Sequence, residues 1–224
     1  MKHSKIHGIA LITGTLGGVI TMLFHPTGRD LLGQPDEIAH RYELITITVH
    51  SLAITSLPIM FFGFLGFSRR LGLGNPLVSA ALIAYGFGAI AVMCAGVING
   101  LVAPVLMRKI NEADEPTQNF LHLVLMNNSL LNQALTKVFV VAVGFALIAW
   151  SIHLWKKGRL MKITAVIGFI VSILSLAGIF SGHLKLDVHG FGLFIFAQSI
   201  WTILVAVFMI RTEKKESDNI SHEI

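Results

Sequence analysis

Charged residues are scarce in this chain of 224 residues and make up only 13% of it. A soluble domain of ordinary composition carries roughly 25% Asp, Glu, Lys and Arg. Hydrophobic residues account for 54% of the sequence, and the mean hydropathy is +0.75. The shortage of charge excludes an ordinary water-soluble domain and indicates that lipid surrounds much of the chain.

Several kinds of chemistry lack the residues they need. The single cysteine, Cys94, cannot form an internal disulfide and belongs to no zinc-ribbon spacing. The sequence contains no phosphate-binding loop, no nucleophile elbow and no His-Glu-x-x-His motif. The sequence pI is about 9.6, but the basic residues stand beside the ends of apolar runs, as membrane topology requires. We therefore expect no nucleic-acid partner.

Long apolar runs recur along the sequence, each close to the roughly 20 residues that a helix needs to cross a lipid bilayer. They are continuous rather than alternating, which favours helices over barrel strands. The sequence predicts an all-α, polytopic membrane helix bundle in one domain, 1–210, followed by a charged, disordered tail, 211–224. The predicted helices cover about 6–24, 41–67, 76–107, 133–155, 163–181 and 190–210. Segment 117–126 is predicted to form either a surface helix or an outward extension of the fourth helix.

Lysine and arginine are distributed unequally between the two ends of the predicted bundle. The end that carries both termini holds eleven of them, and the opposite end holds five. Cytoplasmic loops are enriched in these residues. We therefore predict a multi-pass protein of the bacterial inner membrane, with both termini in the cytoplasm and the lipid bilayer as its immediate partner. No cleavage site follows the first run, so we expect that helix to be retained.

Histidines gather towards the predicted outer end. Six of the ten lie there, namely His25, His40, His50, His122, His183 and His189. His50 lies within the second apolar run, where an ionisable side chain is expected to face the bundle interior or a water-filled cavity. The alternative for His50 is a neutral imidazole that hydrogen-bonds a neighbouring helix.

A second concentration lies in the predicted turn between the fifth and sixth helices. His183, Asp187 and His189 lie within seven residues, and imidazole and carboxylate are ordinary ligands of zinc, copper and iron. A polar loop beside water is the alternative interpretation. The candidate metal ligands are His50, His183 and His189, with Asp187, His40 or Glu43 as a further or orienting group. In the case of haem b, His50 and His189 are the candidate axial pair; a zinc ion with an open position would support hydrolysis of a lipid-linked substrate.

Polar residues near the same end favour a second hypothesis, a small-molecule transporter without enzymatic activity. The candidate pocket-lining residues are His25, His122, Asn128, Asn132, Gln133 and Lys137. Lys137 has an alternative interpretation as a side chain that extends towards the membrane surface. A third hypothesis is a subunit or assembly partner within a membrane complex or homo-oligomer.

Three features together resemble a group of small six-helix bacterial inner-membrane proteins: His25-Pro26-Thr27-Gly28, a histidine-bearing second helix, and the turn 182–190. The resemblance covers most of the chain and implies no activity. The mixture of histidine and carboxylate is also similar in kind to intramembrane zinc hydrolases of the ceramidase and adiponectin-receptor type. Those proteins have seven helices and a serine–histidine–aspartate pattern that does not align here, so no residue role is carried over.

Overall fold

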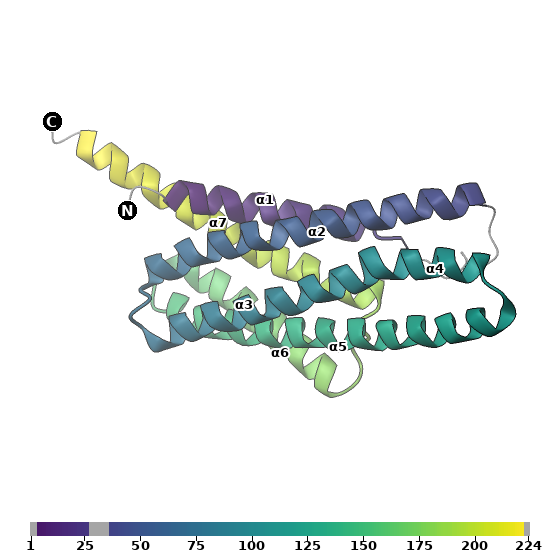
Figure 1. Cartoon of the computed structure of the whole chain (residues 1–224). Helices are drawn as coiled ribbons and strands as arrows, with labels where there is room; N and C mark the ends of the chain where they lie inside the picture. Colours follow the sequence, from purple (N-terminus) through teal and green to yellow (C-terminus); the bar gives the residue numbers. More distant parts are fainter. Residues whose placement is uncertain (1–3, 27–35, 222–224) are drawn as a thin grey trace.

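The computed structural model describes residues 4–26 and 36–221, and every regular element in these ranges is helical. In chain order they are α1 (Ser4–Leu23), α2 (Asp36–Leu71), α3 (Pro76–Val97), the π-helical turn η1 (Ile98–Val102), α4 (Ala103–Glu112), α5 (Glu115–Leu154), α6 (Arg159–Phe180) and α7 (Val188–Ser221). Figure 1 shows the long helices running side by side.

Six helical stretches in the described residues are long and apolar enough to cross a membrane. Each corresponds to one of the predicted helices, and α3, η1 and α4 together form the third of them, Pro76–Glu112. This confirms a helical bundle suited to multiple membrane crossings.

Two differences from the prediction concern helix length. Segment 117–126 is part of α5, whose 40 residues extend about 60 Å at 1.5 Å per residue, so the outward extension is the correct alternative. The tail expected to be disordered instead continues α7 as far as Ser221; residues 222–224 lie outside the described ranges. The reason is that the tail contains no Gly or Pro and many good helix formers, and an existing helix supplies its nucleus.

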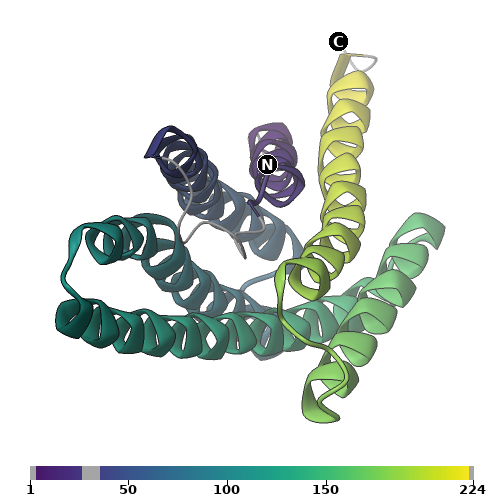
Figure 2. The ribbon, with the colours of Figure 1, turned by 90° about the vertical axis from the view of Figure 1, so that its right-hand side faces the viewer.

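The six long stretches pack in a ring. Helix α1 contacts α2 and α7, α2 contacts α3, α3 contacts α5, and α6 closes the ring between α5 and α7. The end-on view in Figure 2 shows α1 between α2 and α7. Each helix therefore has one face towards the bundle interior and one face outwards.

The outward faces carry large apolar side chains, such as Phe87 and Leu174, each with 67% of its surface exposed. Small polar side chains, such as Ser172 and Thr202, are fully buried. Their hydroxyls donate to backbone carbonyls one helical turn earlier, so burial leaves them hydrogen-bonded. This distribution suits a solvent of lipid tails, in which helices associate through close packing and small residues.

Aromatic side chains fill the half of the bundle where α2 ends. The rings of Phe64 and Trp150 stack at 4.9 Å, and those of Trp150 and Trp201 stack at 5.9 Å. Tyr85 lies over Phe64 at 4.4 Å, and Phe67 meets Trp150 edge-on at 5.8 Å. We call these five residues the aromatic core, and they close this half of the bundle.

Candidate functional site

The opposite half of the bundle holds a buried histidine, His50, whose two ring nitrogens are both hydrogen-bonded. Nδ1 donates to the carbonyl oxygen of Thr46 at 2.8 Å, one turn earlier in α2. A carbonyl oxygen only accepts, so in a neutral imidazole Nε2 carries the lone pair. Asn99 supplies the matching donor, because its Nδ2 lies 3.2 Å from Nε2. His50 is therefore held in one tautomer and one orientation.

The π-helical turn η1 places Asn99 against this histidine. Pro104 lies at the start of α4 and has no N–H to donate to the carbonyl one turn earlier. The helix widens there, and the N–H of Ala103 bonds the carbonyl of Ile98 five residues back. Within the turn, Gly100 faces His50 so closely that a Cβ atom at this position would overlap the imidazole. The absent side chain of Gly100 makes room for His50, and such π-helical insertions recur at functional sites.

His25, just beyond the end of α1, completes a pair of imidazoles. Its ring meets that of His50 edge-on, with the ring centroids 4.9 Å apart. Nδ1 donates to the carbonyl of Pro26 at 3.1 Å, so a neutral ring has its lone pair on Nε2. Burial lowers the pKa of His25 below its usual 6.5, partly offset by that hydrogen bond. His25 is therefore neutral at pH 7 and offers a hydrogen-bond acceptor.

Asp187 stands at the beginning of α7 and carries a negative charge. Gly182 takes a positive φ of 74° and turns the chain out of α6. Asp187 then caps α7: its Oδ1 accepts from the N–H of Gly190 at 2.9 Å, and its carbonyl accepts from Phe191 at 2.9 Å. The Gly190 N–H holds the pKa of the Asp187 carboxyl below its usual range. Asp187 is therefore ionised at neutral pH.

These side chains surround two adjoining spaces. The larger, which we call the main cavity, has a volume of about 290 Å³, and a side cavity of about 190 Å³ lies next to it. His25, His50, Asn99 and Val188 line both. The polar residues that line the main cavity are Thr21, His25, His50, Asn99, Ser129, Asn132, Gln133, Thr136 and Asp187. The volume lies near the lower end of the roughly 300–1,000 Å³ range of small-molecule sites.

The main cavity contains half of the predicted pocket residues. His25, Asn132 and Gln133 line it. His122 is exposed on the outward part of α5, and neither Asn128 nor Lys137 lines either space. The helical period of α5 turns Lys137 away from the face that carries Asn132 and Thr136. His122 and Asn128 lie on or near that face but further along α5, about 15 Å and about 6 Å from Asn132 at 1.5 Å per residue. Sequence reasoning missed Asn99, although an amide within an apolar run is a signal of a buried polar contact.

The structure does not gather the predicted metal ligands. In residues 4–26 and 36–221, no group of three or more His, Cys, Asp or Glu side chains is placed to hold a metal ion. Glu43 instead accepts from Arg108 of α4 at 3.0 Å. His183 contacts the hydroxyl of Ser181 at 2.9 Å on the exposed turn, and His40 and His189 are also exposed. Of this set, only His50 and Asp187 line the main cavity.

The fold and the site define a class of protein: a bundle of helices long and apolar enough to cross a membrane, with aromatic rings packed in one half and a polar cavity in the other. No known protein family, no curated protein sequence and no solved structure matches the chain. The assignment of function therefore rests on the chemistry of the cavity.

Proposed function

We propose that the protein is a membrane carrier for a small solute whose head group is cationic and donates hydrogen bonds. The observation that carries this proposal is the main cavity, whose lining combines an ionised carboxylate with hydrogen-bond acceptors. Among the described residues that line the main cavity, Asp187 is ionised and none is Lys or Arg. A cationic head group complements this charge.

The uncharged lining residues suit the same head group. Nε2 of His25 carries a lone pair, and Asn132 and Gln133 each contribute an amide oxygen. An ammonium or guanidinium group has several N–H donors and no acceptor, so it matches this set better than an anion does. Hydrogen bonds to an ionised partner are also the stronger ones.

Support for a carrier comes from the contrast between the two halves of the bundle. A carrier opens its site to one side of the membrane at a time, so one half is closed while the other admits solute. The aromatic core closes one half, and the main cavity lies in the other. The excess of Lys and Arg near the termini orients the cavity outwards, from a bacterial inner membrane with both termini in the cytoplasm.

Binding is tested by isothermal titration calorimetry, in which methylguanidinium is added to the full-length protein in detergent. This probe stays charged over the accessible pH range, as arginine does. The variant Asp187→Asn is expected to weaken binding about tenfold, because it removes the negative charge that pairs with the cationic head group. Asp114→Asn is the matched control, since Asp114 is an exposed residue that precedes α5 and lines neither space. Absence of binding, or equal affinity in both variants, would contradict the proposed site.

Transport is tested separately with labelled methylguanidinium and proteoliposomes. Uptake above that of empty liposomes, reduced by Asp187→Asn and retained by Asp114→Asn, is the expected result. Binding without any flux would contradict the carrier and favour a receptor or an assembly partner with the same site.

A further inference from the structure

We infer that the solute has a short apolar end, of three or four carbon atoms, which enters a separate chamber beneath the main cavity. This inference rests on the proposed function, because it assigns the other end of the same solute. The inner chamber has a volume of about 80 Å³ and lies among α1, α2 and α7, with Val92 of α3 and Phe139 of α5 completing its lining.

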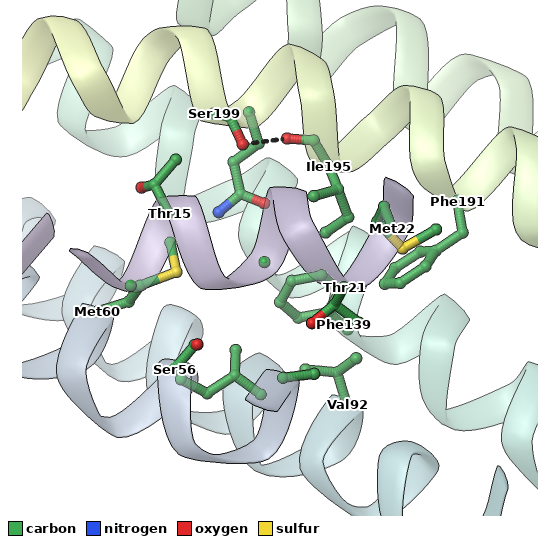
Figure 3. A pocket seen from close by; sticks show the side chains of 15 residues that line it. Thr15, Thr21, Met22, Ser56, Met60, Val92, Phe139, Phe191, Ile195 and Ser199 are labelled. Atoms are coloured by element: carbon green, nitrogen blue, oxygen red, sulfur yellow. Dashed lines mark hydrogen bonds between the residues drawn. The ribbon is translucent and has the colours of Figure 1, made fainter. Parts of the chain in front are cut away.

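The inner chamber adjoins the main cavity. Both spaces are lined by Thr21, Met22, Ala53, Leu57, Val92 and Phe191. Figure 3 shows Met22 and Phe191 next to each other at one end of the chamber, with Thr21 and Phe139 close by. A solute held by its head group in the main cavity therefore lies next to the chamber, and its other end reaches the chamber between these shared residues.

The surface that the chamber presents is apolar. Met22, Met60, Phe139, Phe191 and Ile195 contribute thioether, aromatic and aliphatic groups. Three hydroxyls in its lining donate to backbone carbonyls: Thr21 to that of Gly17, Ser56 to that of Leu52, and Ser199 to that of Ile195.

Two further polar atoms of the lining residues, Oγ1 of Thr15 and Oε1 of Gln198, have no hydrogen-bond partner among the described residues. Both atoms are fully covered by the protein and present no surface to a ligand. They therefore leave the apolar character of the chamber unchanged.

The size of the chamber sets the length of the apolar end. A cavity of about 150 Å³ lined by apolar side chains accepts benzene. At about half that volume, the inner chamber accommodates a branched group of three or four carbons and excludes a long acyl chain. The solute is thus a small amphiphile, with its charged head beside Asp187 and its apolar end between α1 and α7.

Gly18 provides the means to test this. It lies with Gly14, Thr15, Thr21 and Met22 on the stripe of α1 that lines the chamber. A Cβ atom at Gly18 would meet no other atom within 4 Å, so a side chain there enters open space. Gly18→Leu is therefore expected to fill the chamber without displacing its walls. Gly158→Leu is the matched control: this glycine precedes α6, has equal space around it, and lines none of the three spaces.

The experiment compares methylguanidinium with isobutylguanidinium, which has three more carbons, by calorimetry on the full-length protein. Each buried methylene contributes about 0.8 kcal/mol, or about fourfold in affinity, so the wild type is expected to prefer the isobutyl compound about 50-fold. Gly18→Leu is expected to abolish this preference and to leave methylguanidinium binding unchanged, whereas Gly158→Leu keeps both. A second variant, Met60→Ala, enlarges the chamber and is expected to shift the preference towards isopentylguanidinium.

The outcomes separate the two proposals. Equal affinity of the wild type for both compounds, or a preference that survives in Gly18→Leu, would overturn the apolar chamber and leave the carrier with its cationic site. A preference unchanged by Met60→Ala would also count against the chamber. Binding of neither compound would overturn both proposals.

Discussion

The two halves of the bundle differ in the side chains that face the interior, although the same helices run through both. In the aromatic core, Phe64, Trp150 and Trp201 stack on one another, and the one polar atom of Trp150 donates to the hydroxyl of Ser68 at 3.1 Å. Around the main cavity, His25 and His50 each use their ring N–H on the backbone and keep a lone pair on the other nitrogen. The aromatic core still contains two buried polar atoms without a hydrogen-bond partner among the described residues, the Tyr85 hydroxyl and Nε1 of Trp201, whereas the other half holds a cavity lined by polar side chains. We therefore expect substitutions in the aromatic core to act mainly on stability and those around the main cavity mainly on binding.

Truncation of the aromatic core is expected to have the largest effect on stability. Trp150→Ala removes a fully buried ring and leaves the Ser68 hydroxyl without its donor. Substitutions of this kind cost about 3–5 kcal/mol. The measurement is the free energy of unfolding in mixed micelles, with Trp155→Ala as the control, because half of the Trp155 surface is exposed at the end of α5. Similar losses in the two variants would show that the core does not stabilise the closed half.

In the half that holds the main cavity, the substitution Gly100→Ala is expected to affect binding more than stability. Gly100→Ala places a methyl group where the ring of His50 lies, so the imidazole has to leave Asn99. We expect methylguanidinium to bind about tenfold more weakly, which corresponds to about 1.4 kcal/mol. The loss of stability is expected to be smaller than for Trp150→Ala.

Gly96→Ala is the control for this substitution, because Gly96 also lines the main cavity. Its added methyl group would meet Ile54 at 3.3 Å, which a small shift relieves. Equal effects of the two substitutions on affinity would remove the special role of the His50 position.

The sequence predicted the six long apolar helices well, because a helix that can cross a bilayer needs a characteristic length and composition. It also identified His50 and Asp187, which share the main cavity. The predicted ligand set failed to gather because its other members depend on local geometry. His183, Asp187 and His189 are all exposed around the turn at Gly182 and the start of α7, and of these three only Asp187 also lines the main cavity. Asn99 was not predicted because its partner, His50, is 49 residues away, and only the packing of η1 on α2 brings them together.

Binding in the main cavity is expected to depend on pH through His25. Protonation of His25 removes the lone pair on Nε2 and adds a positive charge that repels the guanidinium. Burial lowers the pKa of His25 below 6.5, so affinity is expected to stay constant from about pH 8 to 6.5 and to fall up to tenfold per unit below that pKa. Among the described residues, the other titratable groups that share a cavity with His25 are His50, Asp187 and Tyr42. The low pKa of Asp187 keeps its carboxylate ionised over that range.

Calorimetry across this pH range provides the measurement, and His25→Gln provides the control because it retains polarity without titrating. Affinity in His25→Gln is expected to be independent of pH. A decline that begins above pH 6.5 in the wild type, or that persists in this variant, would contradict the role of His25.

Removal of metal ions is expected to have the smallest effect. A metal ligand must offer a lone pair, but that of His50 accepts from Asn99, and the carboxylate of Glu43 is paired with Arg108. Among the described residues that line the main cavity, His25 and Asp187 remain as histidine or carboxylate ligands, one fewer than the three protein ligands of a catalytic zinc site. Exhaustive treatment with EDTA should therefore leave both the melting temperature and methylguanidinium affinity unchanged. If chelation abolished binding and zinc restored it, a third ligand would have to enter the cavity, and the open half would be a metal site that the bundle completes by moving.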